Sequence, residues 1–508
     1  MSEKRALISV WDKEGVVDLA KGLSQAGWEI ISSSGTARIL KQAGLEIREV
    51  ADLTGYPHML GGRVKTLHPS IFGGILARRH FDEDLNDVEK YGIPLIDMVV
   101  CNLYPFEKVA RKGADLDTLL ENIDIGGVTL IRAAAKNYHQ VILLTDPKDY
   151  GRALQELSAE GNVTIQSRQE FALKGFAATS AYDAAICSGL SRELGKSQAP
   201  ASTIPLVLKP VLALRYGENP HQEASLSLPP LSGLPWEKLA GKELSYNNIL
   251  DLDTALRACA LFHEDPAAVV IKHTTPSGIS IGTDLEKAYM HAVECDPVSA
   301  FGGIVGVTRE LDMKTAEQVA AKFTELLVAP SYAPGVVDFL EKKRPNLRVI
   351  LWKGGRVCSL QFTGTWSGIL VQEDALPPLP DPEKGQWVGS PRPDLWEELV
   401  FAWKTCALSK SNAIVIASGK RTLGIGRGFT SRVDATQWAL SKAGDASHGA
   451  VMASDAFFPF PDSIELAAQS GIKAIIQPGG SIRDDEVFET ARKLGVSLFI
   501  TGWRTFRH

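Results

Sequence analysis

The first 150 residues alternate short apolar runs with stretches of helical spacing. The runs over 6–11, 95–106 and 140–145 are hydrophobic at successive positions, which is typical of strands buried on both faces. Between such runs, residues 14–27 and 36–44 carry apolar side chains at helical spacing and end in glycine, a common helix stop. Repeated strand–helix units of this kind indicate a parallel sheet with helices on both faces. We therefore expect the chain to begin with an α/β domain built on a parallel sheet.

A short segment of small residues separates this domain from the rest of the chain. Residues 196–205 read KSQAPASTIP, and their content of small residues and proline predicts a linker. Because 508 residues are too many for a single hydrophobic core, a division into domains is expected from length alone. We expect one domain over residues 1–200 and a second over 201–508.

The second domain carries a weak internal repeat. Residues 269–282, VVIKHTTPSGISIG, resemble 413–426, AIVIASGKRTLGIG, and the segments GGIVGVT and GAVMASD lie at a similar offset of about 145 residues. Such self-similarity is typical of a duplicated unit. It predicts two similar α/β lobes in tandem, at about 206–376 and 386–508, joined by the proline-rich stretch between them.

Composition and charge argue against several classes of protein. Apolar residues make up 44% of the chain, charged residues 22%, and the net charge is −6 with no strongly basic block, so we expect no nucleic-acid partner. The six cysteines are scattered without a C-x-x-C pair, which argues against a zinc knuckle or a disulfide framework and fits a reducing cytoplasm. No apolar stretch approaches the roughly 20 residues that span a bilayer, and the N-terminus has no signal-peptide core, so we expect no membrane association.

Polar loops of the first domain have the composition of an anion site. SSSGT (32–36) lies at a strand-to-helix junction, where free backbone amides and the helix dipole favour a phosphate, although one of its hydroxyls alone would serve as an ordinary helix cap. GGRVKTLHP brings Arg63, Lys65 and Thr66 onto a loop shaped by glycine and proline. Cations in such a loop neutralise a phosphate or polarise a carbonyl.

Five loops of the second domain combine glycine or proline with residues that bind or react: RYGENPHQ, KHTTPSG, DPVSAFGG, KSNA and SDAFFPFPD. Lys272 and His273 follow an apolar strand run, which suits proton transfer beside a cation; an exposed lysine next to a hydrogen-bonded histidine is the alternative. Arg215, Arg432 and Arg504 have guanidinium groups that grip phosphate in two contacts, although each one singly also suits a surface position. We expect these loops to form one shared site for a polar, anionic small molecule.

The motifs resemble one known family over nearly the whole chain. IDIGGVTLIRAAAKN and FAATSAYDAAI in the first domain, with LRYGENPHQ, DPVSAFGGI and SDAFFPFPDSIE in the second, are similar to the bifunctional purine-biosynthesis PurH family. That family joins IMP cyclohydrolase to AICAR transformylase. The resemblance implies a methylglyoxal-synthase-like parallel-sheet domain, followed by a duplicated cytidine-deaminase-like α/β domain without zinc. It also implies a homodimer with the transformylase site at the subunit interface.

The resemblance implies that the second domain passes a formyl group from the cosubstrate 10-formyltetrahydrofolate to the amine of AICAR, giving FAICAR. The catalytic residues that it implies are Lys272, His273 and Asn412, acting on the amine proton and the developing charge. The residues that match AICAR contacts are Arg215, Tyr216, Gly302, Glu325, Arg432, Phe457 and Arg504. The residues that match positions facing the folate are Val433, Asp462, Ser481 and Ile482. No catalytic metal is implied.

For the first domain, the resemblance implies closure of FAICAR to IMP. The carboxamide nitrogen attacks the formyl carbon and water leaves, without a cofactor. The residues implied for proton transfer and carbonyl polarisation are Lys65, Tyr104, Asp124 and Lys136. Those implied to hold the nucleotide are Lys13, Ser33, Ser34, Gly35, Thr36, Arg63, Thr66, Cys101 and Asn102. The alternative is a first domain that only senses or binds nucleotide, and the proton-transfer set argues against it.

Two single positions and one segment depart from the family pattern. Trp11 stands where the family usually has a small serine beside the phosphate pocket, and Phe72 replaces a usual histidine. GRGFTSRV (426–433) replaces GAGQMSRV, so this loop gains bulk and charge before the Arg-Val pair. The chain therefore differs from the family near Trp11, at Phe72 and in this folate-facing loop.

Overall fold

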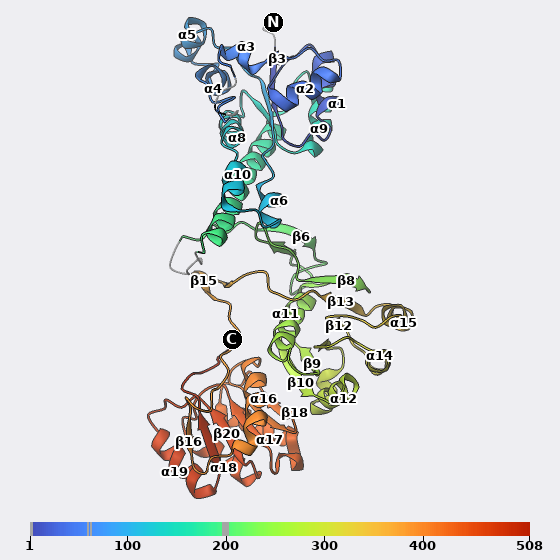
Figure 1. The fold of residues 1–508 in the computed structure, drawn as a ribbon, viewed down its shortest axis with the longest axis vertical. Helices are drawn as coiled ribbons and strands as arrows, with labels where there is room; N and C mark the ends of the chain where they lie inside the picture. The colour runs from blue at the N-terminus through green and yellow to red at the C-terminus, as the bar shows by residue number, and fades with distance from the viewer. Residues whose placement is uncertain (1–3, 58–59, 61–62, 196–202) are drawn as a thin grey trace. The chain divides into compact units, whose positions relative to one another are not determined.

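The computed structural model describes residues 4–57, 60, 63–195 and 203–508. Contacts divide the chain into two units, Met1–Lys209 with Pro229–Ser232, and Pro210–Leu228 with Gly233–His508. The predicted linker at 196–205 lies largely outside the described residues, so the boundary near residue 200 stays a prediction. Figure 1 shows the elements of each unit, coloured along the chain.

The first unit is built on a five-stranded parallel sheet. Its strands are β1 (Arg5–Ser9), β2 (Glu29–Ser32), β3 (Arg48–Glu49), β4 (Met98–Cys101) and β5 (Ile142–Leu144). They lie in the order β3-β2-β1-β4-β5, and each neighbouring pair is parallel. The chain moves outward from β1 to β3 and then returns to the other side of β1 with β4. Open α/β sheets bind ligands at such a switch, outside the carboxyl ends of the strands.

Helices cover both faces of this sheet, as the apolar strands predict. The helices of this unit among the described residues are α1 (Val16–Gln25), α2 (Ser34–Gln42), α3 (Val50–Thr54), α4 (Pro69–Leu76), α5 (Asp82–Lys90), α6 (Phe106–Arg111), α7 (Leu116–Glu121), α8 (Gly126–Lys136), α9 (Tyr150–Glu160) and α10 (Ile165–Glu193). Along β1, Ala6 and Ile8 pack in one buried cluster and Leu7 packs in another. Since successive strand residues point to opposite faces, both faces are buried. The predicted parallel α/β domain is confirmed.

The second unit contains a single sheet of twelve strands. They are β8 (Trp236–Ala240), β9 (Ala267–Lys272), β10 (Thr275–Ile281), β11 (Ile304–Val307), β12 (Leu326–Ala329), β13 (Arg348–Trp352), β16 (Gln386–Val388), β17 (Ile414–Ser418), β18 (Arg421–Gly426), β19 (Val451–Ser454), β20 (Ala474–Gln477) and β21 (Ser497–Ile500). Their order is β16-β21-β20-β19-β17-β18-β10-β9-β11-β12-β13-β8. Two separate hairpins, β6 (Lys209–Ala213) with β7 (Ser225–Leu228) and β14 (Leu360–Thr365) with β15 (Gly368–Glu373), complete its strands among the described residues.

The sheet consists of two halves with equivalent strand order, each counted from the middle of the sheet to its edge. One lobe runs β10-β9-β11-β12-β13-β8 and the other β18-β17-β19-β20-β21-β16, and the lobes meet where Ser280 of β10 pairs with Arg421 of β18. The first two pairs of each lobe are antiparallel, the next two parallel, and the outermost antiparallel. The similar segments 269–282 and 413–426 form β9–β10 and β17–β18, in equivalent places. The predicted duplication is confirmed.

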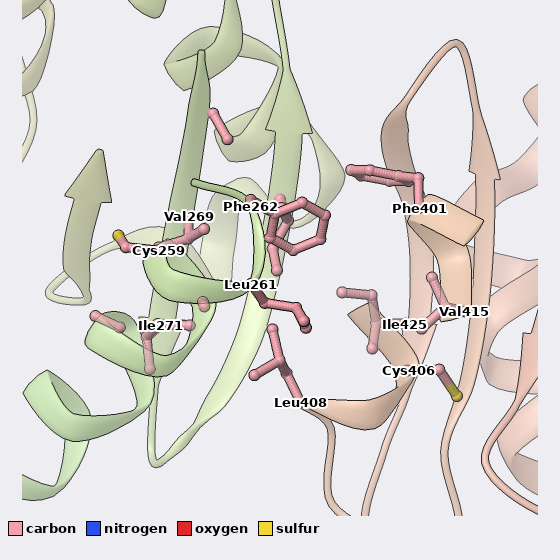
Figure 2. Close-up of a cluster of buried hydrophobic side chains, with 14 of the residues drawn as sticks. Cys259, Leu261, Phe262, Val269, Ile271, Phe401, Cys406, Leu408, Val415 and Ile425 are labelled. Carbon is pink, nitrogen blue, oxygen red and sulfur yellow. The ribbon is translucent and has the colours of Figure 1, made fainter. Parts of the chain in front are cut away.

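A shared hydrophobic core joins the two lobes. The helices of the unit are α11 (Tyr246–Leu261), α12 (Leu285–Cys295), α13 (Pro297–Ala300), α14 (Met313–Ala321), α15 (Val336–Lys343), α16 (Trp396–Ala407), α17 (Arg432–Ala443), α18 (Asp462–Gln469) and α19 (Asp484–Leu494). Figure 2 shows Leu261, the last residue of α11, and Phe262, which follows it, facing Leu408 and Ile425 of the other lobe. The rings of Phe262 and Phe401 lie 5.5 Å apart between centroids. This apolar layer fixes the lobes to one another, and with them the loops at the ends of their strands.

Candidate functional sites

Asn102, directly after β4, joins two loops at the switch in strand order of the first unit. Its Oδ1 accepts hydrogen bonds from the backbone amides of Trp11 and Asp12, at 2.6 and 2.9 Å, and its Nδ2 donates to the Asp12 carbonyl at 3.1 Å. Asn102 therefore ties the loop after β4 to the loop after β1 at the switch in strand order. This is the place where a ligand is expected in such a sheet.

Three predicted catalytic residues of the first unit, Lys65, Tyr104 and Asp124, form a cluster. The Gly127 amide donates to Asp124 Oδ1 at 2.7 Å, and the Tyr104 amide also donates to this carboxylate. Burial raises the pKa of Asp124, while these amides and the charge of Lys65 oppose the rise. Burial, and then the charge of Asp124, raises the pKa of Tyr104. The site thus combines a half-buried carboxylate, a neutral phenol and an ammonium group.

The serine-rich segment lies at a helix start, as predicted. Ser33 precedes α2 as its N-cap residue, and Ser33 and Thr36 are only 7% and 4% exposed. Thr36 Oγ1 donates to the Val10 carbonyl at 2.9 Å, which joins this segment to the loop after β1. Lys13 Nζ donates to the carbonyls of Val10 and Trp11, and burial lowers its pKa. Ser34, Gly35 and their amides lie at the same helix start, where anions are favoured.

Other predicted residues of the first unit occupy different places. Thr66 is 5% exposed and lies against the start of α8, where a Cβ on Gly126 would come within 3.2 Å of its hydroxyl. Arg63 forms an exposed ion pair with Glu121, and the glycines that precede it lie outside the described residues. Cys101 is buried, and burial raises the pKa of its thiol, so it packs in the core as a neutral group.

Lys136 lies apart from the other predicted catalytic residues. It is the last residue of α8, an 11-residue helix that begins beside Asp124. At about 1.5 Å rise per residue, the two ends of this helix are roughly 15 Å apart. The side chain is exposed. A lysine in this place complements the helix dipole, so its catalytic role stays a prediction.

In the second unit, the predicted loops meet along one edge of the twelve-stranded sheet. The register places at this edge the ends of β9, β18, β19, β20 and β21 and the starts of β10, β11, β12, β13 and β17. His273 follows β9, Asn412 precedes β17 and Arg432 follows β18. Loops more than 130 residues apart in the sequence therefore lie along the same edge of the sheet.

The same edge carries the remaining predicted residues of this unit. Gly302 and Glu325 directly precede β11 and β12. Those that follow strands are Val433 after β18, Phe457 and Asp462 after β19, Ser481 and Ile482 after β20, and Arg504 after β21. Their arrangement along the edge agrees with a common site, although individual contacts with a ligand stay predictions.

The turn that carries His273 is a strained one. Lys272 pairs with Thr275 across β9 and β10, which leaves a two-residue turn. The backbone φ is 53° at His273 and 62° at Thr274, the left-handed region that such hairpins use. Asp251 of α11 accepts a hydrogen bond from the Thr274 amide at 2.5 Å and another from the His273 amide. Lys272 Nζ donates to the Phe301 carbonyl at 2.7 Å, so the Lys272 ammonium is held in place beside the anchored turn of His273.

Asn412 and Arg432 belong to one buried network. Arg432 Nη1 donates to Asp455 Oδ1 at 2.5 Å and to Ser454 Oγ at 2.8 Å, and its Nη2 donates to Asn412 Oδ1 at 2.6 Å. Asn412 Nδ2 in turn donates to the Phe429 carbonyl at 3.0 Å. Arg432 is 7% exposed and Asp455 is fully buried. The guanidinium therefore orients the Asn412 amide, and its predicted contact with AICAR stays a prediction.

A cavity of about 490 Å³ brings the RYGENPHQ loop to the starts of β12 and β13. Arg215, Tyr216 and Glu325 line it, so three predicted AICAR contacts meet there. Glu325 accepts from Arg348 at 2.6 Å. The sequence did not single out the other polar lining residues: Lys242, Ser245, Asn248, Thr324, Lys343, Arg344, Asn346 and Arg348. The lining has more cations than anions, which suits a phosphate.

The structure shows what surrounds the residues that depart from the family pattern. The Trp11 ring is 46% exposed and lies 5.9 Å from the Lys108 ammonium, while its backbone amide still donates to Asn102. Phe72 packs against a buried cluster of the first unit. Arg427 follows β18, and burial lowers its pKa against the opposing charge of Asp296.

Comparison with known proteins agrees with this arrangement. The AICARFT/IMPCHase bienzyme family matches residues 134–442, more than half of the chain, and the MGS-like domain matches residues 15–129. The chain belongs to the AICARFT/IMPCHase bienzyme family. Membership gives it AICAR formyltransferase and IMP cyclohydrolase roles in purine synthesis, and the MGS-like match agrees with the parallel-sheet unit.

Relatives of the family cover the chain from end to end. Three are named bifunctional purine biosynthesis protein PurH. The protein from Persephonella marina is 46% identical over 99% of this chain and 100% of its own, and that from Streptococcus pyogenes serotype M3 (strain ATCC BAA-595 / MGAS315) is 45% identical over the same shares. The protein from Bacillus cytotoxicus is 43% identical over 100% of both chains. A crystal structure of ForH is 39% identical, covering 37% of this chain and 100% of that one, with a TM-score of 0.34.

Two further findings concern the part of the chain that the structure describes. It contains no group of three or more His, Cys, Asp or Glu side chains placed to hold a metal ion. No helix in it combines the length and the apolar content that a membrane span requires.

Proposed function

We propose that the two activities of this PurH-family chain lie in separate units. Formyl transfer takes place at the shared strand edge of the second unit, and ring closure takes place at the switch in strand order of the first. The observation that carries this proposal is the register of the twelve-stranded sheet, which supports a common site for His273, Asn412 and the Arg215 cavity loop.

Formyl transfer forms a bond between the AICAR amine nitrogen and the formyl carbon, and breaks the bond from that carbon to N10 of the folate. His273 takes the amine proton, and N10 leaves with a proton in its turn. Lys272 and Asn412 stabilise the negative charge that develops on the formyl oxygen. Each of these groups contributes about 10²–10³-fold in rate. The hydrogen bonds that anchor Lys272 and Asn412 support this arrangement, because they hold both groups in place before substrate arrives.

Ring closure forms a bond between the carboxamide nitrogen of FAICAR and its formyl carbon, and water leaves. Asp124 accepts the carboxamide proton, and Tyr104, kept neutral by its raised pKa, donates a hydrogen bond to the formyl oxygen. Lys65 adds positive charge at the same place. The hydroxyls and amides of the segment from Ser33 to Thr36 hold the phosphate.

The formyl donor in this proposal is 10-formyltetrahydrofolate, facing Val433, Asp462, Ser481 and Ile482. The donor is tested by replacing it with formate or with tetrahydrofolate, neither of which supports transfer if the proposal holds. We also assign the protein to the cytoplasm. All six cysteines are free, which suits a reducing compartment. Cell fractionation with a cytoplasmic marker tests the assignment.

We further propose that the protein is a homodimer whose transformylase site lies at the interface. The β14–β15 hairpin supports this, because Trp366 at its turn is fully exposed and Ile369 and Leu370 are 60% and 65% exposed. An isolated hairpin with apolar side chains in solvent suits burial against another chain. Mixing inactive His273→Ala with inactive Arg504→Ala should restore formyl transfer in mixed dimers if one site takes residues from both subunits. No recovery, with mixed dimers confirmed by mass, contradicts the shared site.

The experiment that tests the function itself supplies AICAR and 10-formyltetrahydrofolate and follows FAICAR and IMP. We expect FAICAR to form first and IMP to follow. The alternative function of the first unit, nucleotide sensing alone, predicts that IMP binds while supplied FAICAR is not turned over. Turnover of FAICAR excludes that alternative, and its absence overturns the proposed ring closure.

A further inference from the structure

Asp251 holds the backbone of the turn from which His273 projects. Its carboxylate accepts from the Thr274 amide at 2.5 Å and also from the His273 amide, so both residues of the turn donate to it. Asp251 is on α11, which packs against β9 and β11. One side chain of a rigid helix therefore fixes the two-residue turn at the end of β9.

The turn needs such a partner because its backbone is unfavourable for its residues. Both φ values are positive, 53° at His273 and 62° at Thr274. Glycine and asparagine favour this region, whereas a β-branched threonine there is a genuine outlier that the surroundings must hold in place. A carboxylate that accepts from two successive amides stabilises this shape through strong, charge-assisted hydrogen bonds.

We infer that Asp251 is a positioning residue for formyl transfer, acting through the His273 turn rather than on the substrate. It aims the imidazole at the amine of AICAR by fixing the backbone on which the imidazole is carried. The inference rests on the proposed role of His273. It assigns to Asp251 an effect on turnover, because a catalytic group displaced by about 1 Å loses roughly 10²-fold in rate.

The test compares Asp251→Ala with Asp251→Asn and with a matched control on the same helix. Asp253 is exposed and bonds only to Arg257 on its own helix among the described residues, so Asp253→Ala should keep normal formyl transfer. We expect Asp251→Ala to lower kcat for formyl transfer by about 30- to 100-fold with KM for AICAR within about twofold. Asp251→Asn keeps an oxygen acceptor and should recover most of the rate. Ring closure of supplied FAICAR should be unchanged in all three.

A second variant separates positioning from a direct effect of the carboxylate charge. Thr274→Gly removes the conformational strain at one turn position, since glycine adopts positive φ without a penalty. The double variant Asp251→Ala/Thr274→Gly should therefore regain at least about tenfold of the lost kcat. If Asp251→Ala does not fold, kcat of Asp251→Asn is compared with kcat of Asp251→Ser. Asparagine keeps an oxygen acceptor at the reach of the natural side chain, whereas serine has a shorter side chain.

The outcomes distinguish the positioning role of Asp251 from the proposed role of His273, on which it rests. His273→Ala that keeps normal formyl transfer overturns the proposed role of His273. If His273→Ala is inactive but Asp251→Ala has a normal kcat, the positioning role of Asp251 is overturned and the role of His273 is not. Loss of rate that neither asparagine nor the Thr274→Gly change recovers also contradicts positioning.

Discussion

Asp84 shows how one charged side chain is tied into this fold. It accepts from the Arg78 guanidinium through both carboxylate oxygens, at 2.6 and 3.0 Å, and from the Arg78 backbone amide at 2.7 Å. The bonds from the Arg78 side chain, and to a smaller extent the bond from its backbone amide, lower the pKa of Asp84 to about 2. An acid with a lowered pKa in the folded state stabilises that state when it is ionised.

We expect the replacement Asp84→Asn to lower the stability of the first unit near neutral pH. The difference from the natural protein should shrink as the pH falls from about 4 toward 2, because the wild-type carboxylate then becomes protonated and loses its advantage. Chemical denaturation at several pH values measures this. A difference that stays constant down to the lowest accessible pH would show that the ion pair is not its source.

Single residues of the site differ in how far the sequence could predict them. Lys272 and His273 stand at the end of an apolar strand run, and that position is visible in the sequence. Asp251 lies inside a helical stretch and touches the turn only because α11 packs beneath it. Lys343 ends α15 and Arg344 directly follows it, where basic residues ordinarily complement the helix dipole, so no local signal connects them with the cavity.

At the scale of elements, both lobes have a glycine where a central strand packs against the helix that follows it, β10 against α12 and β18 against α17. A Cβ on Gly278 of β10 would lie 1.9 Å from the Ala292 carbonyl oxygen of α12. In the other lobe, a Cβ on Gly424 of β18 would lie 2.0 Å from the Ala439 carbonyl oxygen of α17. The obstacle in each case is helix backbone, which cannot move aside as a side chain would. The duplication thus extends from strand order to the closeness of helix and strand.

Replacement of Gly424 by alanine should destabilise the second unit by about 1–3 kcal/mol, because the added methyl group forces α17 away from β18. Gly364→Ala in β14 is the matched control, since a Cβ there has no atom within 4 Å. The free energy of unfolding from denaturant titration checks both. Equal stability of the two variants would contradict the close approach.

Elements were predicted from the sequence where their pattern is local. Continuous apolar runs predicted β1, β4 and β5 of the first unit, and the resemblance between 269–282 and 413–426 predicted the duplicated strand pairs. The joining of both lobes into one sheet was not predicted, because it depends on the meeting of β10 with β18 through Ser280 and Arg421. Such pairing over long separations leaves no periodic signal in either segment.

At the scale of the whole molecule, the chain has two units with different sheets and different candidate sites. The cluster of Lys65, Tyr104 and Asp124 lies within the first, and the strand edge with Lys272 and His273 lies within the second. No residue of either catalytic set belongs to the other unit. Damage to one site should therefore leave the chemistry of the other intact.

The most direct measurement of this claim uses two variants, Lys272→Ala and Asp124→Asn, each supplied with AICAR and 10-formyltetrahydrofolate. Lys272→Ala should form FAICAR and IMP about 10²–10³-fold more slowly but should close supplied FAICAR at the normal rate. Asp124→Asn should accumulate FAICAR, and an equimolar mixture of the two should form IMP after a lag. Loss of both activities in either single variant, with the fold intact, would contradict two independent sites in one chain.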